Sequence, residues 1–359
     1  MPRLTHGVVQ ENRDRSKAAK SASEHNPRVG DCDGTRVIDS SDRSIALAIS
    51  ALRAGNIVAV PTETVYGLAA DASNPGAVAR VFAAKGRPVD HPLIVHLASG
   101  TNLADWARCI PDAAYRLAEE FWPGPLTLIL ERQPPVLDVV TGGLSTVGLR
   151  IPSHPVIQRI LQGFGGGLAA PSANRFGRVS PTSAIDVCDG LAGVVGLIVD
   201  GGQCEVGVES TIVAFVGDEA TILRPGGVSS EAIAQVLGRK PLPATHTSVR
   251  APGTLASHYA PTTPLEICSA NEATRRAATL ASHGMRVGVL TLAPAEVPGV
   301  VVSWNARGDV GILARSLYHY LRLADSESLD ILVVEVPPAH GLGVAVADRL
   351  RRAAHRPTA

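Results

Sequence analysis

Apolar residues recur along residues 42–238 with the spacings that distinguish helices from strands. Spacings of three and four predict helices over 42–54, 76–86, 111–122, 154–163 and 229–238. Short apolar runs predict strands over 56–60, 92–97, 126–131, 146–150, 167–172, 196–202, 210–217 and 220–227. Because the two kinds of element mix without strict alternation, we expect one α/β domain over 37–238 with a large, partly antiparallel sheet.

The pattern changes twice outside that region. Residues 239–263 are proline-rich and aperiodic, which predicts a linker. Strands and helices then follow in order, so we expect a small Rossmann-like α/β domain with a mainly parallel sheet over 264–359. Residues 1–36 are polar and aperiodic, which predicts a disordered extension. No apolar run reaches the roughly 18 residues of a membrane span, so no membrane contact is expected.

Charge and cysteine content narrow the functional classes. The 33 basic and 33 acidic residues cancel, which argues against a strongly basic nucleic-acid binder but leaves a local basic cleft open. The chain has five cysteines and no C-x-x-C pair, which argues against a disulfide framework and against a zinc site. A reducing cytoplasm fits this composition.

Lysine is rare in this chain, and its placement is informative. Of the four lysines, only Lys85 lies between Lys20 and Lys240. Lys85 and Arg87 flank Gly86 just after a predicted helix, and two cations on a short loop suit a polyanion such as a triphosphate. The alternative is a cation that merely complements the helix C-terminus.

Further polar residues gather where predicted strands end. Thr64 follows one strand, Arg150 ends another with Thr146 four residues earlier, and His91 and His96 flank a third. Arg150 could instead pair with an internal carboxylate, and His96 could be an ordinary strand histidine. The remaining candidates on loops and strand ends are Ser172, Asn174, Ser180, Ser210 and Arg224. This distribution predicts a cleft at one edge of the sheet, and no serine or cysteine with a convincing base partner supports covalent catalysis.

Nine segments together resemble a known family. They are VPTETVYGLAADA, KGRPVDHPLIVHL, FWPGPLTLIL, VGLRIPSHP, APSANRFGRVSPT, ESTIV, LRPGG, PGTLASHYAP and GLGVAVADRLRRAA. In this order they resemble the threonylcarbamoyl-adenylate synthases, in the two-domain form with a YrdC-like catalytic domain and a twisted mixed sheet. Two positions depart from the common pattern: His91 stands where Asn is frequent, and Thr-Leu-Ala-Ser precedes His258 where basic residues are frequent.

The resemblance implies a reaction and a role for each candidate. L-threonine, bicarbonate or carbon dioxide, and ATP would give threonylcarbamoyl-adenylate and pyrophosphate. Threonine would contact Thr64, His96, Arg150, the backbone of Ala170, and Ser210. The resemblance assigns to ATP Lys85, Arg87, His91, Thr146, Ser172, Asn174, Ser180, Arg224, and the linker residues His258 and Tyr259, which would act as a lid.

The residue types suit this chemistry. A carbamate oxygen is already anionic, so it needs no side-chain base to attack the α-phosphate. Alignment and charge neutralisation by Lys85 and Arg87, with magnesium on the phosphates, would then carry catalysis. The product would pass to the tRNA threonylcarbamoyl transferase machinery, and a weak direct contact with tRNA stays open. Two other hypotheses are a carbamoyl transfer enzyme of hydrogenase maturation and a non-catalytic RNA-binding module.

Overall fold

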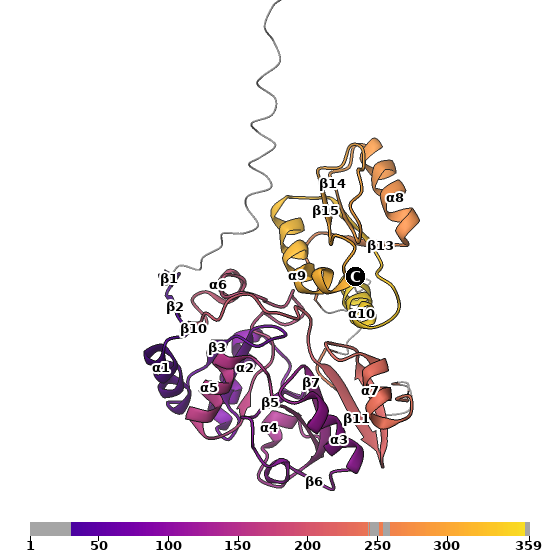
Figure 1. Ribbon diagram of the computed structural model, residues 1–359. Coiled ribbons are helices and arrows are strands. Elements are labelled where there is room, and N and C mark those ends of the chain that lie inside the picture. Colours follow the sequence, from indigo (N-terminus) through magenta and orange to yellow (C-terminus); the bar gives the residue numbers. More distant parts are fainter. Residues whose placement is uncertain (1–29, 243, 245–250, 254–258, 356–359) are drawn as a thin grey trace, which may run out of the picture.

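The computed structural model describes residues 30–242, 244, 251–253 and 259–355, which form a larger and a smaller α/β unit (Figure 1). The helices of the larger unit are α1 (Asp42–Arg53), α2 (Pro75–Lys85), η1 (Leu103–Asp105), α3 (Asp112–Phe121), α4 (Asp138–Thr141), α5 (Pro155–Phe164), α6 (Ala184–Leu191) and α7 (Ser230–Leu237). Its strands are β1 (Gly30–Cys32), β2 (Thr35–Ile38), β3 (Val58–Val60), β4 (Gly67–Asp71), β5 (Ile94–His96), β6 (Ala107–Arg108), β7 (Leu126–Arg132), β8 (Thr146–Arg150), β9 (Leu168–Ala169), β10 (Leu197–Val199), β11 (Thr211–Val216) and β12 (Glu219–Arg224).

These strands form one 12-stranded sheet in the order β1-β2-β10-β3-β4-β9-β5-β8-β7-β11-β12, with β6 paired to β7. Parallel and antiparallel pairs alternate irregularly across it, which confirms the predicted mixed sheet. Side chains of a strand point to opposite faces, so Val58 and Val60 contact α1 and α5 while Ala59 belongs to the core under α2. Helices therefore cover both faces of the sheet around β3.

The helix ends follow the capping signals of the sequence. Asn74 caps α2 by accepting a hydrogen bond from the Ala77 N–H, Pro75 begins the helix, and Gly86 ends it at φ 60°. That left-handed φ is one that glycine adopts without a Cβ penalty. It turns the chain directly after Lys85 and so sets the direction of the following loop.

The N-terminal boundary of the fold differs from the prediction. Residues up to 36 were expected to lie outside the fold, whereas β1 and β2 form an antiparallel hairpin and β2 pairs with β10 in the sheet. Asp33 and Gly34 connect the strands with φ values of 43° and 81°, which suits an Asp-Gly hairpin turn. Strands of three and four residues are too short for periodicity to detect, and the Asp-Gly pair was the available signal.

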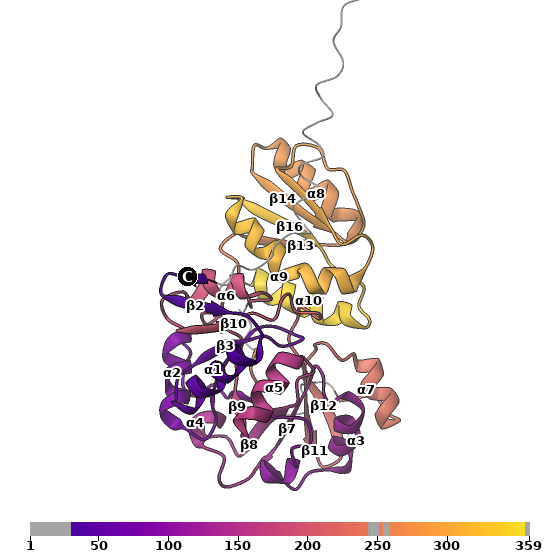
Figure 2. The same cartoon turned by 60° about the vertical axis from the view of Figure 1, so that its left-hand side comes forward.

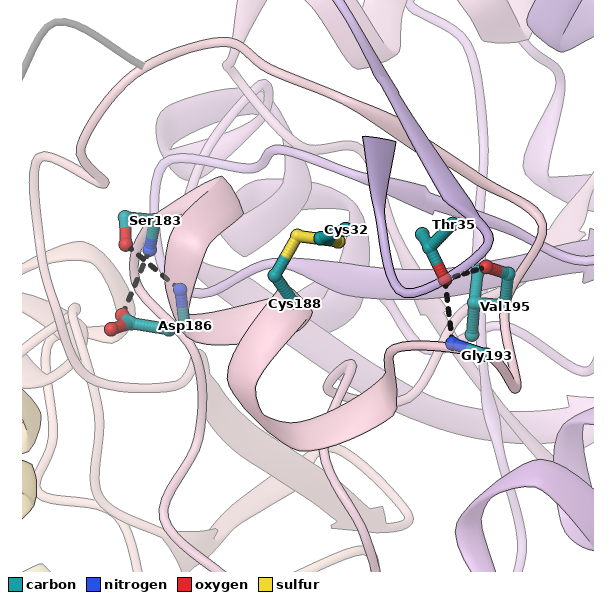
Figure 3. The surroundings of a disulfide bond; sticks show 7 residues. All are labelled: Cys32, Thr35, Ser183, Asp186, Cys188, Gly193 and Val195. Carbon is teal, nitrogen blue, oxygen red and sulfur yellow. Dashed lines mark hydrogen bonds between the residues drawn. A yellow bond between two sulfur atoms is a disulfide. The ribbon is translucent and has the colours of Figure 1, made fainter. Parts of the chain in front are cut away.

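The expectation that no disulfide forms is also wrong. Cys32 at the end of β1 is bonded to Cys188 in α6, 156 residues away in the chain (Figure 3). Nearby, the Thr35 hydroxyl donates to the Val195 carbonyl at 2.6 Å and accepts from the Gly193 N–H at 2.9 Å. Linear spacing cannot reveal such a pair, because it is formed only when the hairpin docks beside α6.

A thiol titration tests this pairing. In unfolded, unreduced protein we expect three reactive thiols, from Cys109, Cys204 and Cys268, and all five after reduction. Substituting Cys188 by serine should raise the unreduced count by one, because Cys32 loses its partner. Five thiols in the unreduced wild type would contradict the bond.

The smaller unit has a four-stranded parallel sheet in the order β13-β16-β14-β15, which confirms the predicted parallel character. Its elements are β13 (Leu265–Cys268), α8 (Ala270–Ser282), β14 (Val287–Thr291), β15 (Val302–Asn305), α9 (Val310–Ser326), β16 (Ile331–Glu335) and α10 (Leu342–Ala354). Val289 and Val333 pack under α8, whereas Leu290 and Leu332 pack under α9 and α10. Helices therefore cover both faces of this sheet as well.

Helices α9 and α10 also pack against the larger unit (Figure 2). One apolar cluster includes Leu317 and Leu350 of these helices together with Val65, Val179 and Val208 of the larger unit. The contact is close, since a Cβ added to Gly207 would lie 2.3 Å from the Arg315 Cα. The two units thus share a continuous core.

Candidate functional site

A cavity lies at the strand ends of the large sheet, beside the segment that leads into the smaller unit. Its walls come from the β3–β4 loop, from β5 and β8, from the residues after β9, from the start of β11 and from the end of β12. The polar side chains in the lining are those of Thr62, Thr64, Arg87, His96, Arg150, Ser172, Glu209, Ser210, Arg224 and Tyr259. Both charged and hydroxyl groups therefore converge on one hollow from strands that are far apart in the sequence.

The hydroxyl groups of the β3–β4 loop are held by local hydrogen bonds. The Thr62 hydroxyl accepts from the Thr64 and Val65 N–H groups at 3.1 and 3.2 Å and donates to the Val65 carbonyl at 2.7 Å. The Thr62 and Thr64 hydroxyls lie 2.9 Å apart. This compact turn needs threonine-type side chains, and it presents Thr64 to the cavity in a fixed orientation.

Arg150 has an internal partner and also lines the cavity. Its Nη2 lies 2.7 Å from Glu63 Oε1, and its Nε donates to the Gly124 carbonyl at 3.2 Å. Both side chains are buried, and the second carboxylate oxygen of Glu63, Oε2, has no hydrogen-bond partner among the described residues. The two alternatives for Arg150 are therefore compatible, because the residue that pairs with Glu63 also lines the cavity.

His96 lies next to this ion pair at the end of β5. It is buried, and its Nδ1 has no hydrogen-bond partner among the described residues. Burial, and secondarily the positive charge of Arg150, lower the pKa of His96 to about 3. The imidazole is therefore neutral at physiological pH, and one ring nitrogen is available to a ligand.

The lowered pKa of His96 predicts a loss of stability in acid. The unfolded chain binds a proton with the ordinary pKa of 6.5 while the folded chain stays neutral, so folding is opposed below that pH. Between about pH 6 and about pH 4.5 this group alone should lower the free energy of unfolding by about 2 kcal/mol. Urea unfolding of wild type and His96→Gln measures it, and equal pH dependence in the two proteins would contradict it.

Ser210 is fixed from two sides at the start of β11. Its hydroxyl lies 2.7 Å from the Thr127 hydroxyl, and Arg224 donates to its carbonyl and hydroxyl oxygens at 2.9 and 3.2 Å. The chain of Gly226 passes so close that an added Cβ would lie 2.3 Å from the Glu209 carbonyl oxygen. The LRPGG sequence therefore brings Arg224 and the ESTIV segment into one wall.

Arg87 and Lys85 differ in where they point. Arg87 lines the cavity, donates to the Pro92 carbonyl at 2.9 Å, and lies over the Phe176 ring; burial lowers its pKa to about 10. Lys85 does not line the cavity. Its ammonium donates to the Ser172 and Asn174 carbonyls, at 2.5 Å each, and so holds the loop that contributes Ser172.

Of the other residues assigned to ATP, four lie away from the cavity lining and one cannot be placed. Ser180 donates to Glu209 at 2.6 Å, and Asn174 donates to the Arg175 and Arg178 carbonyls. His91 packs edge-on against Phe176. Thr146 begins β8, about 13 Å before Arg150 at the usual rise per strand residue. His258 lies outside the described residues.

The linker contributes a wall through Tyr259, Pro252 and Gly253. Tyr259 is buried and has a φ of 63°, and Arg224 donates to the Pro252 carbonyl at 3.0 Å. Gly253 has a φ of 75°, and an added Cβ there would lie 2.4 Å from the Tyr259 hydroxyl. A side chain at Gly253 would displace the tyrosine from the cavity, which explains the glycine.

Two residues of the site had no role assigned from the sequence. Glu209, directly before the Ser-Thr pair that begins at Ser210, lines the cavity and anchors Ser180. Thr62 also lines the cavity, and its hydroxyl orders the loop around Thr64.

The Ala170 backbone was expected to contact threonine. Ala170 lines the cavity, but its N–H already donates to the Ile94 carbonyl at 3.0 Å.

Comparison with known proteins gives matches over both units. Residues 50–226 match the family model described as "Telomere recombination", and residues 228–355 match "Threonylcarbamoyl-AMP synthase, C-terminal domain". A threonylcarbamoyl-AMP synthase of Bacillus subtilis is 42% identical over 90% of this chain and 96% of the relative. One of Pyrococcus abyssi is 39% identical over 86% and 93%. A crystal structure of Pyrococcus abyssi Sua5 complexed with L-threonine matches with a TM-score of 0.82 and 38% identity, over 89% of this chain and 98% of that one.

Proposed function

Since this chain belongs to the threonylcarbamoyl-AMP synthase family, we propose that the cavity at the strand ends is its active site. The enzyme forms threonylcarbamoyl-AMP and pyrophosphate from L-threonine, bicarbonate or carbon dioxide, and ATP. The observation that carries the assignment is the buried Arg150–Glu63 pair, in which Arg150 lines the cavity and Glu63 Oε2 has no hydrogen-bond partner among the described residues. A small zwitterion offers the matching carboxylate and amine.

Threonine would occupy the part of the cavity around that pair. The Arg150 guanidinium would bind the carboxylate, and Glu63 would accept from the amine. The threonine hydroxyl would meet the Thr64 hydroxyl and the neutral ring of His96, and Ser210 would close the opposite side. A neutral imidazole suits this position, because a second cation beside Arg150 would repel the ammonium of the incoming amino acid.

ATP would enter beside threonine from the side of Arg87, Ser172 and Arg224. The threonine amine, as a neutral base, bonds to the carbon of carbon dioxide and loses a proton to give a carbamate. A carbamate oxygen then bonds to the α-phosphorus, and the bond to the bridging oxygen of pyrophosphate breaks with its electron pair. Arg87 and Arg224 would neutralise the charge on the phosphates. Catalysis would then come from the alignment of the two substrates and from electrostatic stabilisation of the phosphate charge.

Magnesium would be held by the nucleotide and not by a protein cage. Among the described residues no group of three His, Cys, Asp or Glu side chains could hold a metal ion. Two buried carboxylates, Glu63 and Glu209, each pair with an arginine, Arg150 and Arg349 respectively. Phosphate oxygens and water are the ligands that Mg²⁺ uses in such sites.

Release of pyrophosphate from ATP tests the proposal. We expect release that depends on both L-threonine and bicarbonate and is lost when either is omitted. Release that requires carbamoyl phosphate instead would favour the hydrogenase-maturation type of reaction, and salt-sensitive RNA binding without release would favour a binding module. Either outcome would overturn the assignment.

The product would serve the threonylcarbamoyl transferase machinery that modifies a tRNA adenosine. An activated carbamoyl-adenylate is labile, so a partner that takes it up at once is expected. A cytoplasmic location is part of the same proposal. In the described part of the chain, no helix has the length and apolar content that crossing a bilayer requires.

A further inference from the structure

The most deeply buried charge in the smaller unit is Arg349 of α10, whose side chain has no exposed surface. Its Nε donates to Glu209 Oε2 at 2.7 Å, and its Nη1 donates to Asp348 at 2.6 Å. Burying a guanidinium is costly unless it is paired. Asp348 belongs to the same unit as Arg349, but Glu209 is a carboxylate of the other unit that lines the cavity.

Glu209 receives hydrogen bonds from both units. The Tyr318 hydroxyl of α9 donates to its two oxygens at 3.0 and 2.8 Å, and the Ser180 hydroxyl donates at 2.6 Å. Glu209 directly precedes Ser210, which Arg224 holds from the other side. The position of the Ser210 wall therefore depends on side chains of α9 and α10.

The same two side chains support the linker wall. The Tyr259 ring stacks on the Tyr318 ring with centroids 5.8 Å apart, and the Arg349 guanidinium lies 5.1 Å from the Tyr259 ring centroid. Tyr259 also keeps a left-handed backbone, which surrounding contacts must stabilise. Two walls of the cavity, which Arg224 also joins through the Ser210 and Pro252 carbonyls, thus rest on one arginine and one tyrosine of the smaller unit.

We propose that the smaller unit is a positioning part of the active site, in which Arg349 and Tyr318 set the Ser210 wall through Glu209 and the linker wall through Tyr259. This inference rests on the proposed function of the cavity. The alternative is that Arg349 only stabilises the contact between the two units and has no effect on the cavity. A second cross-unit pair separates the two ideas: Arg322 of α9 lies 3.4 Å from Asp186 of α6, and neither residue lines the cavity.

The experiment compares Arg349→Met with Arg322→Met in the full-length enzyme. Thermal unfolding identifies a temperature at which both variants are folded, and pyrophosphate release then gives kcat and KM for threonine and ATP. Calorimetry with L-threonine alone adds a binding constant that does not involve the chemical step. We expect Arg349→Met to raise the KM for threonine, or to lower kcat, by about tenfold to a hundredfold, as small misplacements of binding groups do. Arg322→Met should stay within about twofold of wild type, since it weakens docking without moving a cavity wall.

Two milder variants keep the test decisive if Arg349→Met does not fold. Arg349→Lys retains the charge, and we expect partial recovery of the threonine KM. Tyr318→Phe retains the ring that supports Tyr259 and removes only the donor to Glu209, so KM should rise with little change in the unfolding temperature. Wild-type kinetics in folded Arg349→Lys and Tyr318→Phe would overturn the positioning role, as would equal losses in Arg349→Met and Arg322→Met. If the wild-type enzyme released no pyrophosphate in response to threonine, the proposed function itself would be wrong, whatever the variants show.

Discussion

Replacing Arg150 by methionine should lower kcat/KM for threonine by about a hundredfold to a thousandfold, the usual loss when one charged donor leaves a water-poor site. Arg150 lines the cavity and is buried, and its Nη2 lies 2.7 Å from Glu63 Oε1. The other arginines of the lining among the described residues, Arg87 and Arg224, are the ones that we propose for ATP. Pyrophosphate release at varied threonine concentration measures the loss.

The same substitution should destabilise the fold. Breaking a buried ion pair by removing one partner typically costs about 3–5 kcal/mol, because the other charge stays buried alone. Glu63 is that charge, and its exposed side-chain surface is only 4%. The free energy of unfolding in urea should therefore fall by several kcal/mol, on the order of that penalty.

A double variant separates stability from activity. Substituting Glu63 by leucine as well removes both charges and keeps the volume, so most of the lost stability should return. Activity should not return, because threonine then meets neither a cation nor an anion. A double variant with recovered turnover would contradict the assignment of this pair to threonine, even if the stability result held.

Several helices and strands of the larger unit could be predicted because they carry a local signal. Helix α2 has Asn74 and Pro75 at its start and Gly86 at its end, and these act within one turn of the chain. β1 and β2 carry only the Asp-Gly turn signal, since strands of three or four residues show no period and β2 pairs with β10, which is far away in the sequence. The Cys32–Cys188 bond is invisible for the same reason.

For the site, too, the sequence predicted some features and not others. Strand-end polar residues identified the cavity, but their partners are set by contacts across the chain. Arg349 illustrates the limit: it lies four residues from Ala345 and from Ala353 on the buried side of α10, so its burial was detectable. Its role was not, because Glu209 is 140 positions away and belongs to another unit. The sequence likewise indicated Lys85 as a phosphate contact, whereas its ammonium binds two loop carbonyls.

Lys85→Met should lower kcat/KM for ATP by about a hundredfold to a thousandfold, the order of losing one preorganised electrostatic contact. The ammonium is buried, and burial, followed by the charge of Arg87, holds its pKa well below the usual lysine range. Lys85 also binds the 172–176 loop through its backbone, because the Phe176 N–H donates to its carbonyl at 2.7 Å. Loss of the ammonium therefore removes both a buried donor and the anchor of the Ser172 carbonyl.

The matched control is Lys240→Met, the same change at an exposed lysine after α7. It should leave turnover unchanged within about twofold, as surface substitutions usually do. Whether kcat or the KM for ATP changes more in Lys85→Met then distinguishes two roles for Lys85. If the ammonium contacts phosphate directly during the reaction, kcat falls most; if it only holds the loop, the KM for ATP rises most. Unchanged kcat and KM in folded Lys85→Met would remove Lys85 from the nucleotide site, and Arg87 with Arg224 would be left as the cations that face the phosphates.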